Sequence, residues 1–344
     1  MWVLVNLLVM VGMLVVVPGG LRLVGEPKLD GAWRWWLVGA APAAVSLWLP
    51  RGVVAAGLAL GYLVVAGALC AYAMGVVWRA KRAWISKVAV VTALVSPGIA
   101  ASALVAERAG HRLLGFEMGV LALTVAHFHF AGFAAALIAG LHRRVSPGRW
   151  ADVAALTVPA GTLLVLGGYL TGEAAGEFVE LAGAVVLTAG MWIVGWLTWR
   201  HARDQWHGRD SGRKRDRLTG VLLGTSAVVL VASMVLALSW AAGQATGIPH
   251  PSLGWMAATH GVANALGFAV CGVVGWRRAV RPGVPSRPIV PPGVRSRRAA
   301  GPGAPSRRAG RGTGATPRQI TSGPGATPRR AGGGLGVTPR RAGS

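Results

Sequence analysis

The sequence is short of charge, acidic residues and cysteine, and each shortage argues against a class of protein. Only 13% of its 344 residues are charged, whereas about a quarter are charged in ordinary soluble domains. The two cysteines, Cys70 and Cys271, lie in apolar runs without a C-x-x-C spacing, so neither a disulfide framework nor a zinc finger is indicated. These shortages argue against a soluble globular domain.

Several catalytic and cofactor motifs are also missing from the sequence. It has no nucleotide-binding glycine motif in a strand–helix context, no G-x-S-x-G nucleophile elbow and no C-x-x-C-H haem attachment. The question of an enzyme stays open, with a non-enzyme favoured. We predict no bound cofactor.

What the sequence does have is apolar residues, 53% of the chain, in runs long enough to cross a bilayer. We predict an all-α, polytopic transmembrane helical bundle over residues 1–276, with nine spans and a range of eight to ten. Tryptophans flank the short second span, and we expect them at the two membrane interfaces. The predicted spans are 1–17, 35–49, 53–77, 88–106, 113–141, 153–170, a run after Glu180 to about residue 199, 218–242 and 252–275.

The basic residues alternate between the loops. Arg and Lys cluster after the third, fifth, seventh and ninth predicted spans, whereas the loop after the sixth is acidic. Since basic loops stay in the cytoplasm, we expect the N-terminus outside and the C-terminus in the cytoplasm.

Residues 277–344 hold 15 Arg with no Lys and no acidic residue, so they carry much of the net charge of +24. Rich in Pro, Gly and Ser, they cannot bury a core, and we predict a disordered tail. Attraction to anionic lipid head groups is one interpretation, contact with RNA is another, and a low-complexity extension with no specific partner is the third. We expect no specific nucleic-acid partner.

Two histidines stand in the middle of the fifth predicted span, within T-V-A-H-F-H-F-A-G-F. An ionisable side chain at that depth is costly unless it faces protein or water, so His127 and His129 are candidate functional residues. Two residues apart, they diverge by about 200° on a regular helix and cannot share one metal ion. We therefore expect this helix to be central in the bundle or locally distorted.

A second polar point lies in the last predicted span, in T-H-G-V-A-N-A-L-G-F. His260 and Asn264 are four residues apart, so they share one helix face. Measured from the predicted span starts, His260 and His127 differ in depth by about 9 Å. Contact between them then requires helix tilt or a later start to the fifth span.

Three hypotheses fit these polar residues. They form a site for a small solute or for protons, with His127, His129, His260 and Asn264 as candidates; they are hydrogen-bonded contacts between helices in a structural or assembly protein; or the three histidines bind a metal or haem in a redox protein. Secondary candidates share the histidine stripe or lie at helix starts on the outer side, where acids also complement the helix dipole. They are Thr124, Glu117, Glu173 and Glu177.

The two segments that carry these residues, L-T-V-A-H-F-H-F-A-G-F and T-H-G-V-A-N-A-L-G-F, resemble the YndJ-like family of bacterial membrane proteins. The order and spacing of the two motifs look like the family's, and the apolar body to about residue 275 is compatible with it. The resemblance implies a candidate transporter with no established substrate, in the inner membrane of a bacterial cell. It supports the same four residues and supplies no mechanism.

Overall fold

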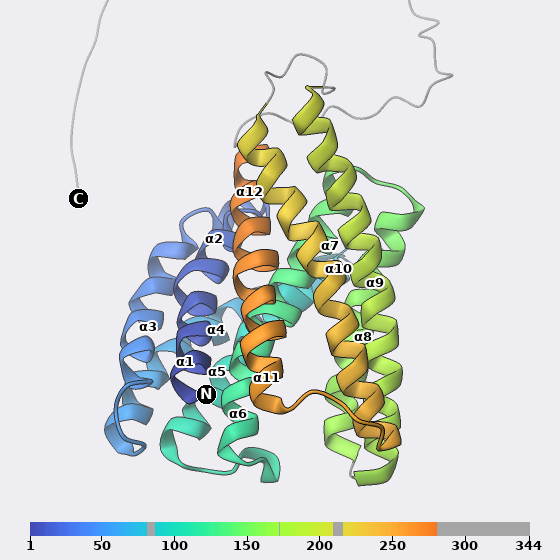
Figure 1. Ribbon diagram of the computed structural model, residues 1–344. Coiled ribbons are helices and arrows are strands. Elements are labelled where there is room, and N and C mark those ends of the chain that lie inside the picture. The colour runs from blue at the N-terminus through green and yellow to red at the C-terminus, as the bar shows by residue number, and fades with distance from the viewer. Residues whose placement is uncertain (81–86, 172, 209–215, 281–344) are drawn as a thin grey trace, which may run out of the picture. The chain divides into compact units, whose positions relative to one another are not determined.

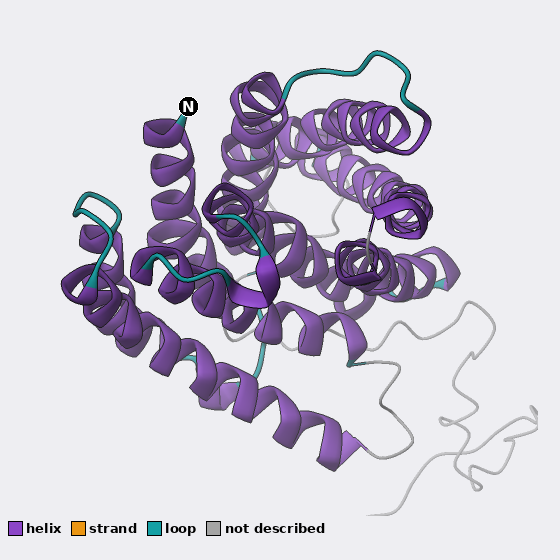
Figure 2. Cartoon of the chain, turned by 90° about the horizontal axis from the view of Figure 1, so that it is seen from below, coloured by secondary structure: helices purple, strands orange, loops and turns teal. Residues whose placement is uncertain are grey.

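The computed structural model describes residues 1–80, 87–171, 173–208 and 216–280. Across them the chain consists of helices joined by loops, with no β-strand (Figure 2). Eight helices are long and apolar enough to cross a membrane, so the predicted all-α polytopic bundle is confirmed. These candidate spans are Trp2–Leu21, Val53–Arg79, Val88–Ala109, Met118–Val145, Arg149–Thr171, Ala175–His207, Arg217–Thr246 and Leu253–Ala279.

Three of these spans change between α-helix and the wider π-helix along their length. The first is α1 (Trp2–Val11), η1 (Gly12–Val16) and α2 (Val17–Leu21); the fourth is α6 (Met118–His127), η5 (Phe128–Ala134) and α7 (Ala135–Val145); the last is α11 (Leu253–Met256), η6 (Ala257–Gly261), η7 (Ala263–Val270) and α12 (Cys271–Ala279). The other long helices are α4 (Val53–Ala80), α5 (Val88–Ala109), α8 (Arg149–Thr171), α9 (Glu173–His207) and α10 (Arg217–Thr246). π-Helical segments widen a helix locally and are frequent at functional sites.

The second predicted span is the helix α3 (Ala32–Ser46), whose 15 residues are too few to cross a bilayer unaided. Its C-terminal carbonyls are capped by a buried cation: Arg108 Nη1 lies 3.2 Å from the Ser46 oxygen and 3.4 Å from the Leu47 oxygen. Glu107 pairs with Arg108 through a 2.6 Å bond to Nη2 and also with the more exposed Arg51 at 2.8 Å. Glu107 and Arg108 belong to the last turn of α5 and anchor α3 beside it.

Tryptophan positions depart in part from the interfacial prediction. Trp35 and Trp48 are exposed, but Trp36 is fully buried, and its indole Nε1 donates to the Met13 oxygen at 2.7 Å. Met13 lies in η1, where the π-helical ladder leaves the backbone irregular. A side-chain donor from α3 thus bonds to the backbone of the span that precedes it in the chain.

The span formed by α6, η5 and α7 is the most buried of the eight. It packs against α5 on one side and α8 on the other, and its π-segment also contacts η1 and η7. Consecutive helices α3, α4 and α5 pack together, as do α8, α9 and α10 (Figure 1). The histidine-bearing segment therefore lies where several helices of the bundle meet.

Most helices begin or end a few residues away from the predicted boundaries, and α9 runs to His207, about eight residues beyond the predicted end. Two of the differences matter for the site and the tail. The fifth predicted span, which is the fourth of the eight observed, begins at Met118 rather than at residue 113. A single 3₁₀ turn, η4 (Leu113–Gly115), precedes it. The last helix continues to Ala279, so Arg277 and Arg278 form its final turn instead of opening the tail. The predicted disordered tail otherwise lies outside the described residues.

Candidate functional site

His127 and His129 point to different sides of their span. His127 closes α6, and η5 begins at the next residue. His127 points into a cavity that faces α9, α10 and the last span, whereas His129 points toward α4. The two residues therefore belong to two different polar arrangements.

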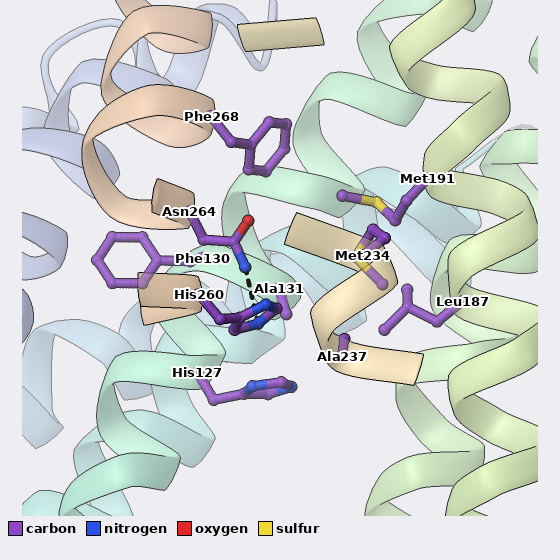
Figure 3. Close-up of a pocket in the computed structure, with 10 residues that line it drawn as sticks. All are labelled: His127, Phe130, Ala131, Leu187, Met191, Met234, Ala237, His260, Asn264 and Phe268. Atoms are coloured by element: carbon purple, nitrogen blue, oxygen red, sulfur yellow. Dashed lines mark hydrogen bonds between the residues drawn. The ribbon is translucent and has the colours of Figure 1, made fainter. Parts of the chain in front are cut away.

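The cavity lies between η5, α9, α10 and the last span (Figure 3). Its polar lining residues are His127, His260 and Asn264. Two methionines, two phenylalanines and three smaller apolar residues complete the wall: Met191, Met234, Phe130, Phe268, Leu187, Ala131 and Ala237. A few polar groups in an apolar wall are typical of small-molecule sites.

The span that carries His127, the fifth predicted and the fourth of the eight observed, starts later than predicted, and this explains why His127 and His260 line the same cavity. His127 lies nine residues after Met118, and His260 lies seven residues after Leu253. At 1.5 Å per residue, the difference in depth falls to about 3 Å. Both side chains then open into one cavity, as Figure 3 shows.

His260 is held in a closed ring of hydrogen bonds with Ser233 and Asn264. Its Nδ1 donates to the Ser233 carbonyl at 2.9 Å, its Nε2 accepts from Asn264 Nδ2 at 2.9 Å, and the Ser233 hydroxyl donates to Asn264 Oδ1 at 2.7 Å. With the Asn264 oxygen accepting from Ser233, Nδ1 carries the proton and Nε2 keeps a lone pair, which is the neutral imidazole. His260 is thus fixed in orientation and tautomer.

His127 differs from His260 because no hydrogen bond occupies its ring among the described residues. Its side chain is exposed to the cavity, and its closest ring neighbour within the span is Phe128, at 6.1 Å between centroids. The only other histidine that lines the cavity is His260, which already uses both ring nitrogens. His127 is therefore the histidine in this cavity that is available to bind a proton or a ligand.

His129 is fully buried and bonds to a tyrosine on α4. Its Nε2 lies 2.6 Å from the Tyr62 hydroxyl, and the Tyr62 ring meets the Trp36 ring edge-on at 5.0 Å between centroids. Nδ1 has no partner at ordinary hydrogen-bond geometry; the carbonyl of Val125, one turn back, is the acceptor nearby. Gly12 leaves the space that the imidazole fills, because a Cβ there would lie 2.6 Å from the His129 Cβ. His129 is part of a packed polar contact between helices.

None of the secondary candidates lines the cavity. Thr124 donates its hydroxyl to the Val120 carbonyl of its own helix at 2.8 Å. Glu117 precedes α6 and pairs with Arg112 at 2.5 Å on the exposed surface. Glu177 is half-buried on α9, and the side chain of Glu173 lies outside the described residues.

The arrangement does not gather the three histidines around one point. In the part of the chain that the structure describes, no three His, Cys, Asp or Glu side chains are grouped for a metal ion. Since His129 is directed to Tyr62 and both nitrogens of His260 are used, a metal in the cavity would have His127 as its imidazole ligand. A metal or haem remains a hypothesis.

Sequence reasoning missed Ser233, Tyr62 and Trp36. A signal for Ser233 was present, because Ser226 and Ser233 are seven residues apart in an otherwise apolar run and so share one helix face. Both serines bond to the last span: Ser226 donates to the Phe268 carbonyl at 2.9 Å. Tyr62 is one of three tyrosines and stands in mid-span, where a hydroxyl needs a partner.

Comparison with known proteins matches a family model described as YndJ-like protein over residues 7–268. The matched region runs from α1 into η7 and contains both histidine segments. No curated protein and no solved structure matches the chain. Because the family model covers most of the sequence, the chain belongs to the YndJ-like family.

Proposed function

We propose that this protein is a transporter that moves a small solute or protons through the cavity between η5, α10 and the last span. The observation that carries the proposal is the contrast within this cavity. His260 is tied into a ring with Ser233 and Asn264, whereas His127 faces the same space with its ring nitrogens unbonded. An ionisable residue that faces a cavity within the membrane marks a substrate or proton path by default.

The unused hydrogen-bonding groups indicate the kind of solute. Asn264 gives one amide hydrogen to His260 and keeps the second, and its oxygen is taken by Ser233. A protonated His127 adds two N–H donors, and no acidic residue is among the lining residues. The cavity then offers three donors without a counter-charge, which favours a small anion bound together with a proton.

The helices and side chains that line the cavity favour local rearrangement around a solute. Both polar walls contain π-helical segments, η5 directly after His127 and η6 with η7 around His260 and Asn264, and such segments are frequent at functional sites. The opposite wall carries Met191 and Met234, whose flexible thioethers can repack around a solute. These features support alternating exposure of the site.

The direct test is uptake into proteoliposomes loaded with a pH-sensitive dye, with small monocarboxylates as solutes. We expect His127→Gln to abolish solute-dependent proton movement, because glutamine preserves a polar side chain and cannot take a proton. His250→Gln is the matched control, since His250 lies in the exposed loop before α11 and outside the cavity. Equal uptake by wild type and His127→Gln would refute the proposal.

A second candidate is a structural or assembly protein in the membrane. The observation that favours it is that His129 and His260 both bond to neighbouring helices. It predicts that His127→Gln and His250→Gln behave alike and that only His129 and His260 variants fail, by unfolding. A metal- or haem-binding redox protein is the remaining alternative, and an absorption spectrum with elemental analysis of the purified protein tests it.

For the location we propose the inner membrane of a bacterial cell, with the N-terminus outside and the C-terminus in the cytoplasm. This orientation counts α3 as a ninth crossing beside the eight long spans, because eight crossings would leave both termini on one side of the membrane. The clusters of Lys and Arg after alternate predicted spans support it. Cysteine labelling from either side, at introduced exposed positions such as Gly31→Cys and Gly148→Cys, tests it. The two positions follow α2 and α7, and we expect both to be labelled from the cytoplasmic side.

A further inference from the structure

A second cavity lies at the basic end of the bundle. It is bounded by the loop after α2, the start of α5 and the end of α7. Its floor is apolar, formed by Val90, Leu137 and Leu141, and its rim is charged. Helix starts and ends place this cavity at the depth where lipid head groups meet the hydrocarbon.

Arg144 at the end of α7 forms no direct ion pair among the described residues, and the acidic group that acts on it electrostatically, Glu26, already pairs with Lys87. Its Nη1 donates to the Val24 carbonyl at 2.6 Å and its Nη2 to the Leu23 carbonyl at 2.8 Å. Both acceptors are neutral, and no carboxylate pairs with Arg144 among the described residues. Gly25, at φ +75°, lets the loop close over the guanidinium, which a Cβ would overlap. The cation is therefore held in place by the loop.

The other charges around the cavity are already paired. Lys87 Nζ lies 3.0 Å from Glu26 Oε1, and Arg143 Nε lies 2.6 Å from Asp152 Oδ1. The Lys87 ammonium, by its hydrogen bond, holds the pKa of the Glu26 carboxyl below its ordinary value, so that carboxyl is ionised at neutral pH. With both pairs balanced, Arg144 leaves a net positive charge beside an apolar floor.

We propose that this cavity binds the head group of an anionic phospholipid, with the lipid phosphate at Arg144 and the Lys87 ammonium at the rim. A cation held by neutral carbonyls keeps its charge available to a phosphate, and the remaining guanidinium hydrogens can donate to its oxygens. The apolar floor accepts the adjoining glycerol and upper acyl segment. Basic pockets between transmembrane helices are a recognised setting for such head groups. This inference does not depend on the proposed transport.

The test is the thermal unfolding midpoint of the whole purified chain in neutral detergent, titrated with dioleoyl phosphatidylglycerol or with dioleoyl phosphatidylcholine. We expect only the anionic lipid to raise the midpoint in a saturable way. Arg144→Gln and Lys87→Gln should each weaken apparent binding about fivefold, the effect of one basic residue near a membrane surface. Arg149→Gln, an equal loss of charge next to the exposed Trp150 and outside the cavity, should bind like wild type.

Lys87→Gln keeps the test decisive if Arg144→Gln fails to fold, because the Lys87 side chain is 40% exposed and contributes no backbone cap. Equal stabilisation by both lipids would overturn the proposal. An equal loss of binding in Arg149→Gln would also overturn it, since the effect would then be general surface charge. Full stabilisation by inorganic phosphate alone would also overturn it, because the ligand of the cavity would then be a free anion and not a lipid.

Discussion

Removing the Tyr62 hydroxyl should destabilise the protein without touching the cavity. Tyr62 and His129 are both completely buried, and their 2.6 Å contact joins α4 to η5. Tyr62→Phe keeps the ring and its edge-on contact with Trp36, but it leaves His129 Nε2 without a partner. Nδ1 has no regular partner either, so the imidazole would lose its one well-formed hydrogen bond.

The expected magnitude follows from the burial of both groups. Leaving a buried polar atom unpaired costs about 1–3 kcal/mol, whereas hydrogen bonds between transmembrane helices average about 0.6 and reach about 1.7 kcal/mol. The lower average arises because unfolded helices in lipid find other partners. The His129 ring would have both nitrogens unpaired and no exposed surface, so its cost lies at the upper end of the range for hydrogen bonds between helices. We therefore expect Tyr62→Phe to lower the free energy of unfolding by about 1.5 kcal/mol.

The assay is reversible unfolding in mixed detergent, with a double-mutant cycle between Tyr62→Phe and His129→Leu. The coupling should be at least about 1 kcal/mol, because either single change removes the same bond. Tyr169→Phe is the matched control: Tyr169 is 46% exposed and should change stability by less than about 0.5 kcal/mol. If Tyr62→Phe costs no more than Tyr169→Phe, the contact adds nothing to stability and the reasoning fails.

Two further predictions concern packing and pH. Gly12→Ala should cost about 2 kcal/mol or more, because its Cβ would collide with His129, whereas Gly57→Ala, with open space around it, should be neutral or stabilising; thermal unfolding of both compares them. The contact between Glu26 and Lys87 should make stability depend on acid. Because the folded-state pKa of Glu26 lies below its ordinary value of 4.5, its contribution is present above that pH and is lost as pH falls below it. The unfolding midpoint of Glu26→Gln should therefore equal that of wild type at low pH and lie below it at neutral pH.

The spans could be predicted from the sequence because length and apolarity alone identify them. α3 was harder, since its 15 residues are stabilised by Arg108, and a guanidinium that caps another helix cannot be located from hydropathy. The start of the fourth span was placed five residues early for a similar reason: residues 113–117 are apolar enough to continue a run but form a 3₁₀ turn and a cap.

The candidate site could be predicted only in part. His127, His260 and Asn264 stood out because polar residues are rare in apolar runs, and the structure brings all three to one cavity. Ser233 and Tyr62 did not stand out, because single hydroxyls are common in membrane helices and their partners depend on how the helices face one another. The π-helical segment that begins between His127 and His129 is another feature that the regular-helix angle of about 200° does not include.

The position of the first span has a consequence for how the protein is assembled. Its end, at Gly19 and Gly20, packs against Val273 in the final described helix and against Phe133 in η5. Of the described helices it is synthesised first, yet one of its native neighbours, the last span, leaves the ribosome last. It must therefore wait in the bilayer, where an apolar helix is stable alone, until the last span is inserted. Biogenesis should then end with a late docking step, and a chain truncated before residue 253 should integrate into the membrane but remain open to proteases.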